Sequence, residues 1–180
     1  MICVCNLSEM PRHVAALRPS HLVSLVPPAE QPPTPPGIPG ARHLRLEIDD
    51  INQPLPGHIL PQADHIAALI EFVKDWRGEA PLLLHCVAGV SRSMAAALIA
   101  LNLASPRREA ETGAHVRRAA PHAVPNRRMI ELADRLLGCQ GRLVAAREAM
   151  GPAVPLAAAP LVRLPLLQRP AKKRGQRLAR

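Results

Sequence analysis

The sequence predicts an α/β fold with a central, mostly parallel sheet flanked by helices. Three observations predict it: short strand-like runs in the first third of the chain, helical patterns in the remainder, and between them an apolar run over 81–84 without polar alternation. Such a run is typical of a parallel strand that is buried on both faces. Strands separated by helices are characteristic of layered α/β folds, in which ligands bind at the carboxyl ends of the strands.

Three runs near the start of the chain have the composition of strands. They span Ile2–Cys5, His21–Val26 and His43–Ile48, and each lies beside a turn signal. The segment Pro27–Gly40 separates the last two and holds seven of the 21 prolines. Because proline fixes φ and lacks a backbone donor, we expect this segment to be a stiff surface loop.

Helical periodicity begins after Pro61. A helix is predicted from there to about Gly78, because apolar side chains recur on one face at helical spacing. These side chains are Ile66, Leu69, Ile70, Val73 and Trp76. After the strand at 81–84 and a short loop, the run from Ser93 to Leu103 is apolar nearly all round, which predicts a central buried helix.

Two further helices are delimited by capping residues. The first is expected to run to about Ala120, with Ser105 as its cap and Pro106 at its first position. The second is expected to begin after Asn126 and to end near Leu137.

The chain is expected to divide into one compact domain over 1–150 and a tail over 151–180. Residues 141–150 are expected to add one or two helical turns to the domain. The tail is rich in Pro, Ala and Arg, and we expect it to be poorly ordered, although 161–167 is apolar enough to pack against the domain. Seven of the 23 basic residues but none of the 14 acidic residues lie in 163–180, so the rest of the chain is nearly neutral.

Composition excludes several classes of protein. The chain has one Phe, one Trp and no Tyr, so it lacks the aromatic platforms that bind single-stranded nucleic acid. Its nearly neutral body argues against nucleic-acid binding, and only the basic tail leaves such a contact open. No apolar run approaches the ~20 residues of a membrane span, and no secretory signal is recognised. Four cysteines do not make a disulfide scaffold, so we expect a reduced, cytoplasmic protein.

The most informative stretch is HCVAGVSRS at 85–93, which follows the predicted buried strand. Backbone N–H groups of a short loop can surround a common centre, and the helix that begins near Arg92 directs the positive end of its dipole there. Arg92 can add a bidentate contact to a tetrahedral oxyanion. Cys86 is expected at the floor of the loop, where the same positive field stabilises a thiolate that faces a bound phosphoryl group.

This string resembles the His-Cys-x5-Arg-Ser signature of the cysteine-dependent protein tyrosine and dual-specificity phosphatases. The resemblance covers 1–140 in the order of elements, is specific over 85–93 and weaker at 49–51, and suggests a small, bacterial-type member. It implies a phosphotyrosine protein phosphatase-like fold and a catalytic domain over 1–150.

The resemblance also implies roles for the matched residues. Cys86 would attack phosphorus and form a cysteinyl-phosphate, and Arg92 would bind the phosphate and the transferring group. Ser93 would donate a hydrogen bond to the leaving thiolate, and His85 would orient the loop and help keep that thiolate. The phosphate-binding loop would be formed by Val87, Ala88, Gly89, Val90 and Ser91, with Arg92.

A general acid is also implied by the resemblance, and two aspartates compete for that role. Asp49 and Asp50 follow the third strand at a suitable distance before the cysteine, and no Trp-Pro-Asp string is present. We favour Asp50, with Asp49 as the fallback. One of the pair is expected simply to form the turn after the strand.

The expected activity is metal-independent hydrolysis of phosphate monoesters, without a cofactor. The expected substrate is phosphotyrosine in proteins, alone or together with phosphoserine and phosphothreonine. A small phosphate monoester is the alternative substrate. The loop has no lysine, which makes a highly anionic substrate less suitable. Two alternatives stay open: a catalytically silent phosphate-binding module and a rhodanese-like sulfurtransferase.

The remaining cysteines are expected to be structural. Cys3 and Cys5 fall on one face of the first strand, and Cys139 follows a helix stop. A thiolate is prone to oxidation, so a redox role for one of these three as a partner of Cys86 also stays open.

Overall fold

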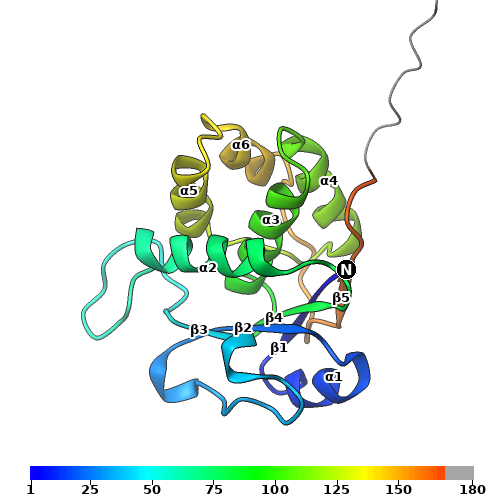
Figure 1. The fold of residues 1–180 in the computed structure, drawn as a ribbon. Coiled ribbons are helices and arrows are strands. Elements are labelled where there is room, and N and C mark those ends of the chain that lie inside the picture. The colour runs from blue at the N-terminus through cyan, green and yellow to red at the C-terminus, as the bar shows by residue number, and fades with distance from the viewer. Residues whose placement is uncertain (169–180) are drawn as a thin grey trace, which may run out of the picture.

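The computed structural model describes residues 1–168 and contains one five-stranded sheet in the order β3-β2-β4-β1-β5 (Figure 1). The strands are β1 (Ile2–Asn6), β2 (His21–Val26), β3 (His43–Glu47), β4 (Leu82–Cys86) and β5 (Val162–Leu164). The first four pair in parallel, and β5 pairs antiparallel with β1. The predicted α/β class and mostly parallel sheet are therefore confirmed.

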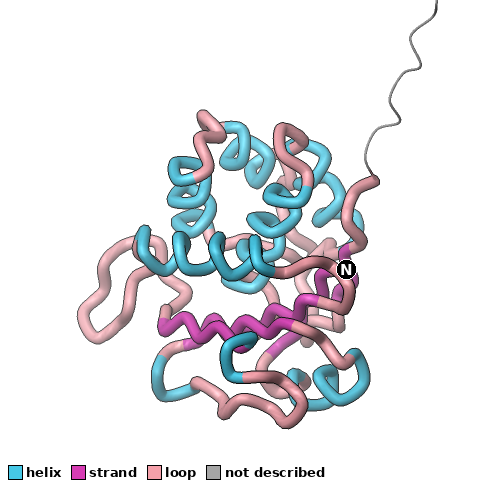
Figure 2. The backbone as a smooth tube through the Cα atoms, in the orientation of Figure 1, coloured by secondary structure: helices cyan, strands magenta, loops and turns pink. Residues whose placement is uncertain are grey.

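Helices cover the two faces of the sheet unequally. The helices are α1 (Met10–Leu17), α2 (Ala63–Asp75), α3 (Arg92–Ala104), α4 (Glu109–Ala119), α5 (Arg127–Leu136) and α6 (Arg142–Glu148). Figures 1 and 2 show α1 and the Pro-rich loop on one side of the sheet, and α2 to α6 on the other. The helix α3 is buried over most of its length, as its all-round apolar sequence predicts.

Alternation along the strands separates the core into two clusters. In β4, Leu82, Leu84 and Cys86 belong to the cluster under the larger helical layer, whereas Leu83 belongs to the smaller cluster on the side of α1. Because side chains alternate across a strand, His85 lies on the same side of the sheet as Leu83. Cys86 and His85 thus belong to opposite faces of one strand.

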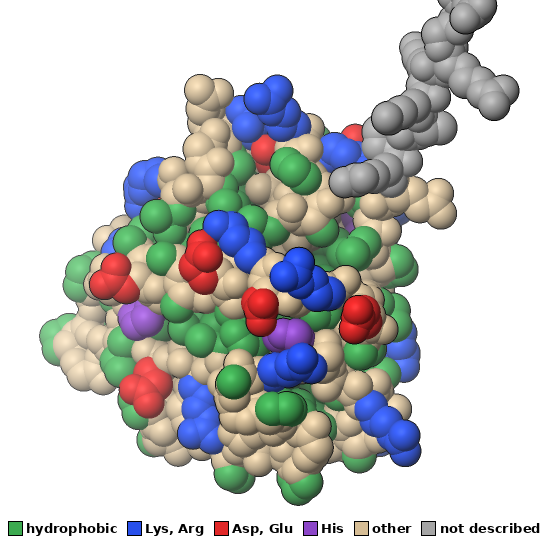
Figure 3. All heavy atoms as spheres, in the orientation of Figure 1, with side chains coloured by type: hydrophobic (Ala, Val, Ile, Leu, Met, Phe, Trp, Pro, Cys, Tyr) green, Lys and Arg blue, Asp and Glu red, His purple; other side chains and the backbone are tan. Residues whose placement is uncertain are grey.

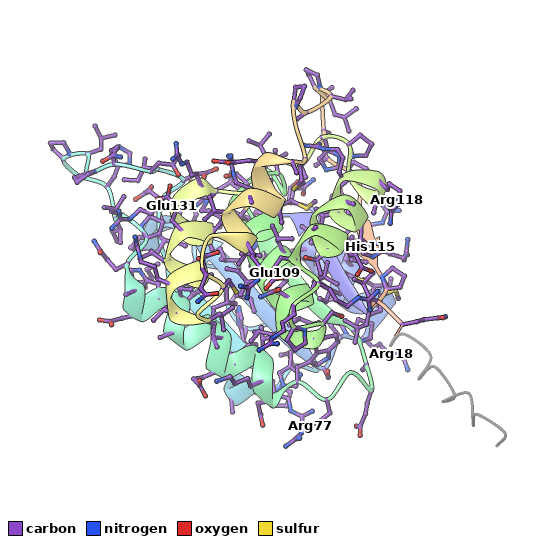
Figure 4. All side chains as sticks on the ribbon, turned by 90° about the horizontal axis from the view of Figure 1, so that it is seen from above. Arg18, Arg77, Glu109, His115, Arg118 and Glu131 are labelled. Carbon is purple, nitrogen blue, oxygen red and sulfur yellow. The ribbon has the colours of Figure 1, made fainter. Side chains whose placement is uncertain are left out.

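Away from the sheet edge, Glu109 and Arg142 join two helices of the larger layer. Glu109 is buried on α4 (Figure 4), and its carboxylate lies 3.3 Å from Arg142 Nε on α6. A cavity of about 760 Å³ beside this pair also borders Asn102, near the end of α3. It lies at the opposite end of α3 from the HCVAGVSRS motif.

Two helix predictions need correction. The helix α1 was not expected, because Met10 and Val14 are its only buried residues and give too little periodicity to recognise. The helix expected to begin at Pro106 begins instead at Glu109. Arg107 takes a positive φ of 63°, so the chain turns there before it becomes helical, and Ser105 caps no helix start. Asn126 does cap α5, since its side chain accepts a hydrogen bond from Met129 N.

The expected tail contributes a strand to the sheet. Within 151–168, β5 pairs with β1, and Val162 and Leu164 are buried, as the apolar composition of 161–167 allowed. Backbone pairing with β5 covers the edge of β1, which would otherwise expose unpaired N–H and C=O groups. Residues 169–180 lie outside the described residues, and the division of the chain at residue 150 stays a prediction.

The described surface carries both signs of charge. In the view of Figure 3, basic and acidic side chains lie interspersed rather than gathered in one basic region. Over residues 1–168, no helix is long and apolar enough to cross a membrane.

Candidate active site

The HCVAGVSRS motif forms a loop between β4, which ends at Cys86, and α3, which begins at Arg92. Cys86 is buried, and its Sγ accepts a hydrogen bond from Gly89 N at 3.3 Å and lies 3.1 Å from Ser93 Oγ. Ser91 occupies the N-cap position, but its side chain makes no capping bond to α3. The first-turn N–H groups of α3 therefore face the loop and favour an anion there.

Arg92 connects this loop to the segment after β3. Its side chain is buried, and Nη1 donates to the carbonyl oxygen of Ile48 at 2.8 Å. Its Nε is buried and has no hydrogen-bond partner within the described residues. The guanidinium is thus fixed at one nitrogen and retains donors for a phosphate.

The two aspartates make different contacts. Asp49 accepts a hydrogen bond from Ile59 N at 2.7 Å, and its own N–H donates to the Ile59 carbonyl, which closes the 49–59 loop. Asp50 instead accepts from Ser91 Oγ at 2.6 Å and is tied to the HCVAGVSRS loop. The hydrogen bond from Ile59 N, followed by the His58 ring and the Arg92 charge, lowers the pKa of Asp49.

Asn126 is a site residue that the sequence analysis recognised only as a helix cap. Besides capping α5, its Nδ2 donates to Asp50 Oδ1 at 2.8 Å, and its main-chain N–H donates to the Ser91 carbonyl. Asn126 therefore holds Asp50 and the loop in one arrangement. A capping asparagine carries no sequence signal for this second contact, because the partner lies 76 positions away.

His85 lies beneath the loop on the other face of the sheet. It is fully buried, and its Nε2 is 2.6 Å from Ser24 Oγ. Burial is the largest cause that lowers the pKa of His85, to about 4, so the ring is neutral at pH 7. A neutral, anchored imidazole fits the orienting role that was expected of it.

Substitution of Gly89 by alanine is expected to displace the loop. Gly89 has a φ of +74°, and an added Cβ would lie 2.9 Å from the carbonyl carbon of Cys5, in the backbone of β1. We expect a loss of roughly 3 kcal/mol in unfolding free energy, measured by urea denaturation, together with loss of phosphate binding.

Gly37→Ala is the matched control for Gly89→Ala. Gly37 has a φ of +89°, but nothing lies within 4 Å of an added Cβ there. Only backbone strain of about 1–2 kcal/mol remains. Equal destabilisation by the two substitutions would show that the approach to β1 does not matter.

Acid is expected to destabilise the fold between pH 6.5 and 4. Burial lowers the pKa of His43 and of His85 from 6.5 to about 4. In this window the unfolded chain binds protons at these rings and the folded chain does not, so stability is lost as the pH falls. His43→Gln removes one of these groups, so its Tm should fall less steeply than the wild-type Tm from pH 7 to 4.5. Parallel curves would contradict this account.

Comparisons with known proteins agree with this architecture. A family model described as protein-tyrosine phosphatase matches residues 55–130. DUSP15 superposes with a TM-score of 0.60 at 16% identity, over 83% of this chain and 87% of its own. Human DUSP28 gives a TM-score of 0.55 at 19% identity, over 83% of this chain and 89% of its own. No curated protein matches the sequence.

A third similar structure is the human tyrosine phosphatase-like serine/threonine/tyrosine-interacting protein. Its TM-score is 0.60 at 18% identity, over 77% of this chain and 92% of its own. At such identities these structures establish the fold, which is that of the protein tyrosine phosphatase class. The motif and the family model, which covers 55–130 only, agree with this fold, and membership of the cysteine-dependent protein tyrosine and dual-specificity phosphatase superfamily stays a prediction. The bacterial type of member stays a prediction.

Proposed function

We propose that the protein is a phosphatase that hydrolyses phosphate monoesters through a cysteinyl-phosphate intermediate, without a metal ion. The observation that carries the proposal is the convergence of Cys86 Sγ, the Gly89 N–H and Ser93 Oγ at the floor of a loop that Arg92 flanks. A module that only binds phosphate needs neither the thiol nor the hydroxyl beside it.

In the first step, the Cys86 thiolate attacks phosphorus, the P–S bond forms and the bond to the ester oxygen breaks. Asp50 gives a proton to that oxygen as it leaves. Both the Ser91 and the Asn126 hydrogen bonds go to Asp50 Oδ1, so we assign the transferred proton to Oδ2. Arg92 and the N–H groups of the loop stabilise the charge on the transferring group.

In the second step, water attacks the cysteinyl-phosphate while the Asp50 carboxylate takes its proton. The P–S bond breaks, and the sulfur leaves as a thiolate that accepts a hydrogen bond from Ser93 Oγ, 3.1 Å away. Inorganic phosphate is released, and the enzyme returns to its starting state.

The surroundings of the loop favour a phosphorylated side chain that carries apolar surface. Val87 in the loop is 40% exposed, and Val124 is 46% exposed. A hydrogen bond of 3.0 Å from Val124 N to the Val90 carbonyl ties that segment to the loop. This apolar border supports phosphotyrosine, alone or with phosphoserine and phosphothreonine, as the substrate in proteins. A cytoplasmic location stays a prediction.

The test is hydrolysis of an aryl phosphate by the purified chain with chelator and reductant present. We expect turnover that does not depend on added metal. Phosphate binding without turnover would instead indicate a silent binding module, and sulfur transfer from thiosulfate without phosphate release would indicate a rhodanese-like activity.

A further inference from the structure

A chain of hydrogen bonds leads from the buried His85 to the Pro-rich loop. Ser24 Oγ lies 2.6 Å from His85 Nε2 and 2.7 Å from His43 Nε2. His43 Nδ1 lies 2.9 Å from Thr34 Oγ1, which also accepts a hydrogen bond from Arg45 Nη2 at 3.3 Å. We call Thr34, His43, Ser24 and His85 the relay.

The relay crosses three neighbouring strands on the face that α1 and the Pro-rich loop cover. Ser24 in β2 is in register with His85 in β4, and His43 begins β3. Ser24 is fully buried and is the single polar residue between apolar neighbours in 22–26. A buried hydroxyl is costly without partners, so both of its hydrogen bonds are required for this position to be tolerated.

Proton counting restricts the relay to two states. Both histidines are neutral at pH 7, because burial lowers the pKa of each to about 4. Within the described residues Ser24 Oγ contacts only these two Nε2 atoms, so its one proton goes to one of them and the other histidine must donate to Ser24. All the hydrogen bonds therefore run either toward His85 or away from it.

Thr34 selects between these two directions. Its Oγ1 accepts from Arg45 Nη2, and within the described residues the one acceptor for its own proton is His43 Nδ1. His43 then carries its proton on Nε2 and donates to Ser24, and the Ser24 hydroxyl donates to His85 Nε2. His85 is left with its proton on Nδ1.

We propose that Ser24 and His43 are positioning residues that hold His85 in its Nδ1–H tautomer and thereby fix the first peptide of the phosphate-binding loop. The inference rests on the proposed function, in which Cys86 is the nucleophile. Without the Ser24 proton, His85 can carry its own proton on Nε2 instead, and its ring loses the hydrogen bond that fixes its position next to Cys86. The loop then loses the Gly89 N–H contact that stabilises the thiolate, so reactivity falls although no residue of the loop has changed.

The first experiment measures alkylation of Cys86 by iodoacetamide against pH, with the modified site identified by peptide mass spectrometry. Ser24→Ala should lower the rate at pH 6.5 about tenfold, which is the upper range for one hydrogen bond, and should move the midpoint of the profile to higher pH. Ser24→Thr keeps the hydroxyl and should restore the profile. Aryl phosphate turnover is measured in parallel.

The matched control is Ser20→Ala. Ser20 Oγ lies 3.0 Å from Nδ1 of His21. This is also a serine–histidine hydrogen bond, but it lies at the start of β2, far from the loop. This variant should alkylate as the wild type does. A Ser24→Ala profile equal to that of Ser20→Ala would overturn the relay. A chain that alkylates as expected but does not hydrolyse phosphate would overturn the proposed function alone.

A second measurement does not depend on any variant folding. The ¹⁵N shifts of the imidazole rings in the wild-type chain report which nitrogen carries the proton. We expect His85 to be protonated at Nδ1 and His43 at Nε2. Protonation of His85 at Nε2 would reverse the direction of the relay and overturn the inference.

Discussion

Replacement of Cys86 by serine is expected to abolish hydrolysis while phosphate still binds. A serine hydroxyl is not ionised at neutral pH. Within residues 1–168 the Cys86 side chain makes hydrogen bonds only with Gly89 N and Ser93 Oγ, and neither is a base that could activate a hydroxyl. We expect kcat to fall roughly 10⁴-fold or more, as for other enzymes that lose their nucleophile. Aryl phosphate turnover and titration with inorganic phosphate measure the two effects.

Cys139→Ser is the matched control for Cys86→Ser. Cys139 is also buried, but its thiol accepts from Asn102 Nδ2 at the far end of α3. This variant should keep turnover within about twofold of the wild-type rate, because the loop and its contacts are unchanged. Retained turnover in Cys86→Ser would remove the cysteinyl-phosphate from the mechanism. Loss of phosphate binding in that variant would show that the thiolate holds the loop open.

The sequence predicted those elements whose pattern of apolar residues matches their place in the folded core. The unalternating run before Cys86 became β4, and the all-round apolar segment from Ser93 became the buried α3. The loop between them follows from these two elements, since a strand and a helix joined by five residues leave little freedom. The positions of Cys86, Ser93 and Arg92 were therefore accessible to sequence reasoning.

Long-range contacts were not accessible in this way. Ser24 appeared only as one polar residue in an apolar strand, and nothing near it in the sequence indicates that two histidines 19 and 61 positions away flank its hydroxyl. The strand β5 was hidden for the same reason, because its three residues become a strand only when β1 offers an open edge.

Asp50→Ala is expected to lower kcat by about 10²–10⁴, the usual contribution of a general acid. The fall should be largest for esters with poor leaving groups, because these need the proton most, and phosphate binding should be nearly unchanged. Asp49→Ala should have a smaller effect on kcat. Asp49 closes the 49–59 loop through Ile59, and its lowered pKa leaves it without a proton to donate to a leaving group.

The two aspartate variants, measured with a good and a poor leaving group, decide between the candidates. If Asp50 is the acid, Asp50→Ala lowers kcat much more for the poor leaving group than for the good one. Asp49→Ala should lower kcat equally for both, because it only disturbs the 49–59 loop. Asn126→Ala then serves as an intermediate case, since it removes one of the hydrogen bonds that hold Asp50 Oδ1 but leaves the carboxylate in place. Full activity in Asp50→Ala, together with loss of activity in Asp49→Ala, would transfer the role to Asp49. The Ser91 hydrogen bond to Asp50 would then be a contact that only shapes the loop.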